Sequence, residues 1–186
     1  MRKNRDTKRV EACSGFSVIE LLIVMAVMSV MAAIGLPSLQ RTLRIHRILG
    51  DSRGIAQTLT LAKMRAAANF TIEAVDWDPS NKSFSMKYFR KNPAQFETDV
   101  SAQSVNLSTG VSLGLPASGS STAVGTDNTS GILFNSRGLP VNASFNPINT
   151  PQAFYFNNGT DYYAVSVAVS GRVQTWKYID SAWLAQ

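Results

Sequence analysis

Apolar residues form one long run near the start of the chain, between residues 16 and 36. The only charged residue in this run is Glu20. A helix rises about 1.5 Å per residue, so a helix of this length can cross the roughly 30 Å hydrocarbon core of a bilayer. We therefore predict a transmembrane helix over residues 16–36. A carboxylate in lipid costs about 3 kcal/mol unless it is paired or protonated, so Glu20 is expected to have a partner.

The pattern becomes amphipathic after residue 36. Residues at alternating spacings of three and four form one helical face, which is apolar except at Ser52 and is typical of a face that packs on a core. This face comprises Ile45, Ile48, Ser52, Ile55, Leu59, Ala62 and Ala66. We predict that the helix continues over residues 37–68. A kink is expected at Pro37, because proline removes one backbone donor and crowds the preceding turn.

Beyond residue 69 the pattern changes to a period of two residues, which is typical of strands. Strands are predicted over residues 70–77, 83–89, 131–134, 153–156, 162–169 and 173–178, and one short strand is predicted within residues 105–115. Residues 90–103 and 117–131 are predicted to be loops, the second because it is rich in Ser, Gly and Thr. The predicted fold class is α+β, with a long N-terminal helix packed on an antiparallel β-sheet or sandwich domain over residues 69–186.

The charge distribution predicts how the chain is oriented in a membrane. The net charge is +6 over 186 residues. Residues 1–15 hold an excess of basic residues, with Arg2, Lys3, Arg5, Lys8 and Arg9 against Asp6 and Glu11. Basic residues that flank the first apolar helix hold that flank in the cytoplasm. The part of the chain that follows the helix is therefore expected outside the cytoplasm.

The sequence contains few of the residues that catalysis or metal binding usually requires. Its single cysteine is Cys13 and its single histidine is His46. Sets of His and Cys that bind zinc need more such residues, and a Ser/His/Asp set would depend on His46, which lies on the predicted helix. We therefore expect no enzymatic activity, no cofactor and no metal site.

The residues that begin the apolar run carry a specific resemblance. The sequence Gly15-Phe16-Ser17-Val18-Ile19-Glu20 resembles the processing site of type IV prepilins and type II secretion pseudopilins. The resemblance implies that a prepilin peptidase and methyltransferase removes the leader, residues 1–15. It would cut between Gly15 and Phe16 and methylate the new amine of Phe16. Glu20 would then form a salt bridge with the amine of a neighbouring subunit during filament assembly.

Three segments in the last third of the chain narrow the resemblance. Residues 132–138, 163–167 and 170–173 are similar to the GspH/FimT group of minor pseudopilins and minor pilins. The resemblance implies a pilin-like fold and a structural subunit at or near the tip of a type II secretion pseudopilus or a type IV pilus. It also implies a single-pass protein of the bacterial inner membrane with a periplasmic C-terminal domain. Its partners would be membrane lipid and other pilin or pseudopilin subunits.

DNA binding is the alternative function. Some FimT-like minor pilins bind DNA during natural transformation through a Gly-Arg-x-Arg motif. The corresponding segment here is Gly171-Arg172-Val173-Gln174, in which the second arginine is replaced by Gln174. One arginine gives weak phosphate contact, although Lys177, Lys87 and Arg90 are candidates to supplement Arg172. We favour the simpler interpretation, a turn that needs Gly171 followed by an exposed arginine, and keep a DNA site at Arg172 and Lys177 as the alternative.

Overall fold

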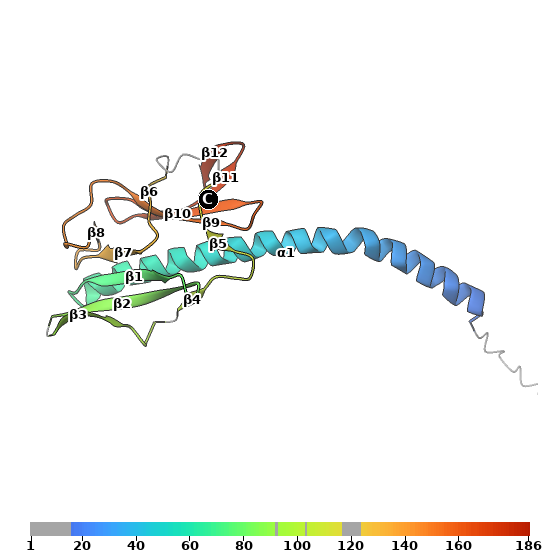
Figure 1. Ribbon diagram of the computed structural model, residues 1–186, viewed down its shortest axis with the longest axis horizontal. Coiled ribbons are helices and arrows are strands. Elements are labelled where there is room, and N and C mark those ends of the chain that lie inside the picture. The colour runs from blue at the N-terminus through green and yellow to red at the C-terminus, as the bar shows by residue number, and fades with distance from the viewer. Residues whose placement is uncertain (1–15, 92, 103, 117–123) are drawn as a thin grey trace, which may run out of the picture. The chain divides into compact units, whose positions relative to one another are not determined.

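The computed structural model describes residues 16–91, 93–102, 104–116 and 124–186. Its first element is the helix α1, Val18–Ala68, which has 51 residues and contains Pro37 (Figure 1). The chain separates into two compact units, residues 1–41 and 42–186, and α1 contributes to both. The helix does not break at Gly35 or Pro37, and the kink at Pro37 stays a prediction.

The described strands form two sheets of six strands each. The first sheet has the order β3-β2-β1-β7-β8, with β4 beside β2. Its strands are β1 (Glu73–Asp78), β2 (Ser83–Lys91), β3 (Ala94–Thr98), β4 (Val105–Asn106), β7 (Gly131–Phe134) and β8 (Pro140–Val141). All its pairings are antiparallel.

The second sheet has the order β12-β11-β10-β9-β5, and β6 pairs with β9 as the one parallel neighbour among the described strands. Its strands are β5 (Ser112–Leu113), β6 (Thr126–Asp127), β9 (Gln152–Asn157), β10 (Tyr162–Val167), β11 (Val173–Ile179) and β12 (Ala182–Ala185). In the view of Figure 1, β1–β3 lie below the second half of α1 and β9–β12 lie above it. The predicted fold class, a long helix packed on an antiparallel β domain, is confirmed.

Some predicted boundaries are wrong. Residues 90–103 were expected to form a loop, but residues 94–98 form β3, in which Phe96 pairs with Phe89 of β2. The first strand begins at Glu73 instead of Phe70, because Phe70 adopts a φ of 50° and is 80% exposed. Residues 105–115 were predicted to hold one short strand and hold two, β4 and β5. In the predicted loop over 117–131, residues 117–123 lie outside the described residues, whereas Thr126–Asp127 form β6.

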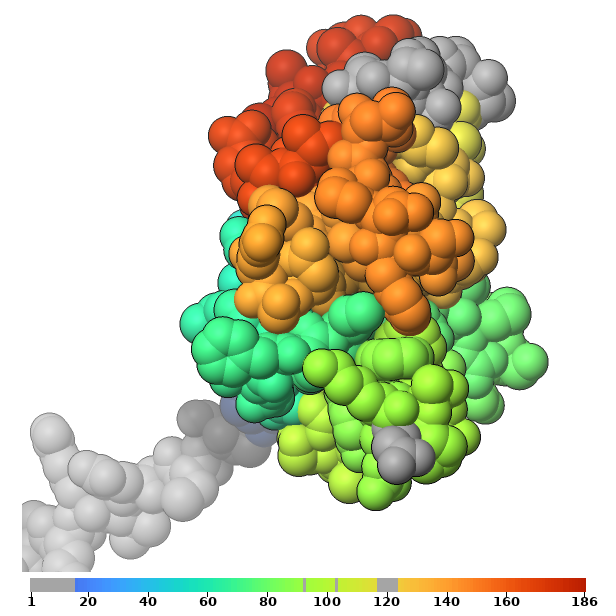
Figure 2. Space-filling view, turned by 90° about the vertical axis from the view of Figure 1, so that its left-hand side faces the viewer, coloured from blue at the N-terminus to red at the C-terminus, as the bar shows by residue number. Residues whose placement is uncertain are grey.

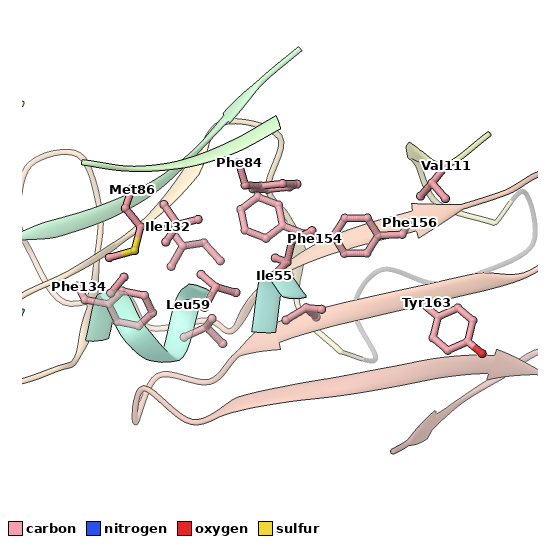
Figure 3. Close-up of a cluster of buried hydrophobic side chains, with 14 of the residues drawn as sticks. Ile55, Leu59, Phe84, Met86, Val111, Ile132, Phe134, Phe154, Phe156 and Tyr163 are labelled. Carbon is pink, nitrogen blue, oxygen red and sulfur yellow. The ribbon is translucent and has the colours of Figure 1, made fainter. Parts of the chain in front are cut away.

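The core lies between the second half of α1 and the two sheets. The predicted helical face is confirmed over most of its length, since Ile48, Ser52, Ile55, Leu59, Ala62 and Ala66 are fully buried. The sheets contribute Val75, Phe84, Met86, Ile132, Phe134, Phe154, Phe156, Tyr163, Val165 and Val167. Figure 3 shows Phe84, Met86, Ile132, Phe134 and Phe154 gathered around Ile55 and Leu59 of α1. Burial of each large apolar side chain contributes about 1.5–3 kcal/mol. This core therefore joins the helix to both sheets.

A charged residue of α1, Asp51, is also buried in this region. The carboxylate of Asp51 accepts hydrogen bonds from the backbone N and the Oγ of Ser108, both at 2.8 Å. Two hydrogen bonds to a carboxylate offset part of the cost of burying it. Asp51 therefore ties the segment between β4 and β5 to α1, a contact that the apolar pattern does not predict.

Candidate assembly segment and C-terminal turns

The apolar run remains uncovered in the single chain. Every residue from Phe16 to Arg44 is exposed, including the large apolar side chains of residues 16–36. Within the described residues, α1 is the one helix that is long and apolar enough to cross a membrane, with a mean hydropathy of 2.5 over its most apolar window. An exposed apolar surface of this size needs lipid or other apolar helices around it. The run therefore has the properties of an insertion or assembly segment.

Glu20 lies in the first turn of α1. The carbonyl of Ser17 accepts hydrogen bonds from the backbone N of Glu20 at 3.1 Å and of Leu21 at 3.2 Å. Ser17 is thus the N-cap residue and Glu20 occupies the third helical position, which is the spacing of a capping box. A carboxylate at this position is also favoured by the positive end of the helix dipole. The Ser-x-x-Glu spacing is visible in the sequence itself. Gly15 lies outside the described residues.

The two glycine turns of the C-terminal resemblance meet beside α1. Gly138 and Gly171 have φ values of 72° and 76°, a region that favours glycine. The ammonium of Lys63 donates a hydrogen bond to the carbonyl of Gly171 at 2.9 Å. A Cβ added at Gly171 would lie 2.2 Å from the carbonyl oxygen of Gly138. The two turns lie so close together that packing requires a glycine at position 171.

Arg172 and Lys177 occupy different surroundings. Arg172 is exposed and precedes β11, whereas the ammonium of Lys177 lies 5.8 Å from the ring centroid of Tyr163. Strand alternation places Lys177 and Gln174 on opposite faces of β11. The other two cations considered as supplements to Arg172 are in ion pairs, Lys87 with Asp76 and Arg90 with Glu97, each at 2.8 Å.

A groove of ≈ 560 Å³ borders Arg172. It runs between exposed residues of α1 and the start of β11, and its lining includes Leu61, Met64, Arg172 and Gln174. Sites that track a nucleic-acid backbone are basic along their length and carry aromatic stacking platforms. The lining of this groove contains one cation and no aromatic side chain, so its chemistry differs from such a site.

The described residues contain no group of three or more His, Cys, Asp or Glu side chains that could hold a metal ion.

Residues 12–36 match the family described as the prokaryotic N-terminal methylation motif. The chain therefore carries a prepilin-type amino terminus, as its resemblance predicted. The cut at Gly15 and the methylation of Phe16 themselves stay predictions.

Two solved structures are similar to the chain, both of the minor pseudopilin EpsH from the type 2 secretion system of Vibrio cholerae. One has a TM-score of 0.48 and 13% identity, and the match covers 75% of this chain and 97% of EpsH. The other has a TM-score of 0.48 and 10% identity, with coverage of 72% and 94%. At these values the likeness says nothing about function. No curated protein matches the chain.

Proposed function

We propose that the chain is a minor pseudopilin or minor pilin, a structural subunit that assembles at or near the tip of a type II secretion pseudopilus or a type IV pilus. The observation that carries this proposal is the methylation motif over residues 12–36 at the head of a helix whose apolar half is exposed throughout. Such a helix inserts in the inner membrane as a precursor and packs against the helices of other subunits in a filament. The folded unit, residues 42–186, supplies the surface of the subunit.

Processing precedes assembly in this proposal. A prepilin peptidase cuts after Gly15 and methylates Phe16, and the mature chain enters the filament through its apolar helix. The basic residues of 1–15 hold the leader in the cytoplasm, so the β-rich domain faces the periplasm. The protein acts as a substrate of that enzyme and as a building block, without catalytic chemistry of its own.

DNA uptake is the second candidate, and the described geometry gives it little support. Two of its four cations are already in ion pairs, and the groove beside Arg172 is lined partly by apolar side chains. Phosphate binding depends on unpaired cations that replace the counterions of DNA. We therefore do not extend the proposal to DNA.

Intact-mass analysis of the protein from its native host tests the proposal. We expect a mature chain that lacks residues 1–15 and carries one additional methyl group on Phe16. Gly15→Val should block the cut, because a bulky side chain beside the scissile bond would not fit the peptidase cleft. Ser14→Ala, a neighbouring change of small size, should leave processing intact. A membrane-bound protein that still begins at Met1 would refute the proposal.

A further inference from the structure

A second pocket, of ≈ 450 Å³, lies where α1 ends and the first sheet begins. Figure 2 shows the end of α1, in teal, beside the lime-green part of the first sheet on this face of the molecule. The pocket is lined by Arg65, Asn69, Thr71, Glu73, Tyr88, Asp99 and Ser101. It belongs entirely to the unit of residues 42–186.

Glu73 is the unusual member of this lining. Its side chain is among the largest that are fully buried, with 1% of the residue exposed. Its Oε2 atom is buried and has no hydrogen-bond partner among the described residues. A buried carboxylate oxygen without a donor is costly and uncommon in native proteins. The site therefore lacks a hydrogen-bond donor at this atom.

The other acids around the pocket are already satisfied. Asp99 forms an ion pair with Arg65 and accepts hydrogen bonds from the N and Oγ of Ser101 at 2.9 and 2.6 Å. Glu97, beside the pocket, accepts hydrogen bonds from Tyr88 at 2.6 Å and from Arg90 at 2.8 Å. Among the lining residues, the charges of Glu73 and Asp99 are opposed by Arg65 alone, which leaves one negative charge without a counterpart.

The end of the helix adds to this negative potential. The last carbonyls of a helix carry a partial negative charge, and α1 ends at Ala68, next to Asn69 in the lining. Burial and the charge of Asp99 raise the pKa of Glu73 to about 7, and the opposing effects of Arg65 and a hydrogen bond from Asn69 do not restore the ordinary value of 4.5. One further positive charge would balance the pocket.

We propose that this pocket receives the side chain of a lysine or arginine from a neighbouring protein, whose N–H groups bind the free oxygen of Glu73. An ammonium or guanidinium brings both the missing charge and the missing donor. A metal ion fits less well, because the described residues contain no group of three acidic, His or Cys ligands. That the neighbour is another filament subunit rests on the proposed function. The cation site itself does not.

Small organic cations test the chemistry of the site. The full chain, in detergent at pH 8, would be titrated with n-butylguanidinium and with n-butylammonium at constant ionic strength, and the melting temperature would be recorded. Both should raise it by binding the folded state. Tetramethylammonium, which has the same charge but no N–H donor, should have no such effect. Calcium chloride is the fourth titrant. A melting temperature that rises with calcium, but with neither n-butylguanidinium nor n-butylammonium, would overturn the proposal in favour of a metal site.

Two variants test whether the small cations bind at Glu73. Glu73→Gln keeps the shape of the side chain and removes its charge, and should weaken binding of n-butylguanidinium about tenfold or more. Asp180→Asn makes the same change in net charge at an exposed residue outside the pocket, and should bind as the parent does. Equal binding by the parent and Glu73→Gln would refute the site.

The neighbour is identified by crosslinking in the native host. A photo-reactive residue at Ser101, which lines the pocket and is exposed, should capture a peptide that contains a lysine or arginine, and Glu73→Gln should abolish this product. Binding of the small cations without such a product would overturn the role of a neighbouring protein. A protein that binds n-butylguanidinium but retains residues 1–15 would refute only the proposed function, so the two failures are distinguishable.

Discussion

A buried carboxylate such as Glu73 makes the stability of the folded protein depend on pH. Its pKa is about 7 in the folded state against 4.5 as the ordinary value, so between these values the folded state holds a proton that the unfolded state has lost. The associated stability is fully present below about pH 4.5 and is lost as the pH rises through about 7. Asp99 and Arg65 are the charged residues that face Glu73.

We therefore predict that Glu73→Gln gains stability relative to the parent as the pH is raised from 5 to 8. The measurement is the melting temperature of both full chains at each pH, since all other titrating groups are common to the two proteins. Their difference should be small near pH 5 and largest at pH 8. If the melting temperatures of the two proteins changed with pH in parallel, the pH dependence would not come from Glu73.

The glycine turns allow a second test at the scale of single residues. Gly171→Ala introduces a methyl group against the carbonyl of Gly138 and also places alanine at a positive φ. Gly159 has a similar φ of 87°, but a Cβ there meets nothing within 4 Å. Gly159→Ala should therefore cost about 1 kcal/mol from the backbone alone, and Gly171→Ala roughly 3 kcal/mol. Denaturant unfolding measures both, and equal losses would show that the turns do not interlock.

The sequence could indicate these glycines but could not assign a role to Glu73 or Asp51. Glycine next to polar turn residues is a local signal: Gly138 follows Ser136 and Arg137, and Gly171 lies between Ser170 and Arg172. Glu73 lines one pocket with Asn69 and Asp99, and these neighbours follow from how the helix meets the sheet. A period of two residues places Glu73 on the same face as Val75 and Trp77, but the pattern alone does not distinguish a core acid from a surface acid.

At the scale of elements, helix periodicity was the most informative signal. The spacing of Ile48, Ile55 and Leu59 predicted the buried face because an unbroken helix fixes which residues share a side. Edge strands were harder to predict. β3 has mostly exposed residues and β12 has only four, so neither has a buried face that would impose a clear alternation. Both are identified by their pairing with β2 and β11, which the sequence does not show.

The buried face of α1 predicts how the chain tolerates truncation. A fragment that begins near Leu43 retains every fully buried residue of α1 and should be monomeric and rich in strands. A fragment that begins at Asn69 lacks Ile48, Ile55 and Leu59, and should aggregate because it exposes the apolar faces of both sheets. Size-exclusion chromatography and circular dichroism distinguish the two. A folded, monomeric fragment from Asn69 would mean that α1 does not complete the core.

At the scale of the whole molecule, the two units of the chain differ in how far their apolar side chains are buried. Residues 42–186 bury an apolar core of their own, whereas residues 16–36 leave their apolar side chains exposed. Bulk apolar contact between helices in lipid does not define how far one subunit is shifted along another. A pair of opposite charges in the apolar surroundings would define that shift, and Glu20 is the only charged side chain in the run that could supply one member.

Glu20 has two candidate roles, which make different predictions. As a capping residue it stabilises its own helix, and glutamine serves equally well at the third position of a capping box. As the partner of the Phe16 amine of a neighbouring subunit it must be charged, and removal of one member of a buried ion pair costs about 3–5 kcal/mol. Glu20→Gln therefore separates the roles, because it preserves the cap and removes the charge.

We predict that Glu20→Ala and Glu20→Gln are both inserted in the membrane and cut after Gly15, and that both fail to join other pilin-like subunits. The measurement is co-purification or crosslinking with those subunits, together with secretion or piliation in a deletion strain. Ser17→Ala is the matched control, since it weakens the cap by about 1 kcal/mol and leaves the carboxylate in place. Normal assembly of Glu20→Gln, with a defect in Glu20→Ala and Ser17→Ala, would assign Glu20 to the cap and rule out the ion pair.

A subunit that occupies the first position at a tip has a neighbour on one side only. Partial assembly of Glu20→Gln with an intact Ser17→Ala would therefore place this chain there.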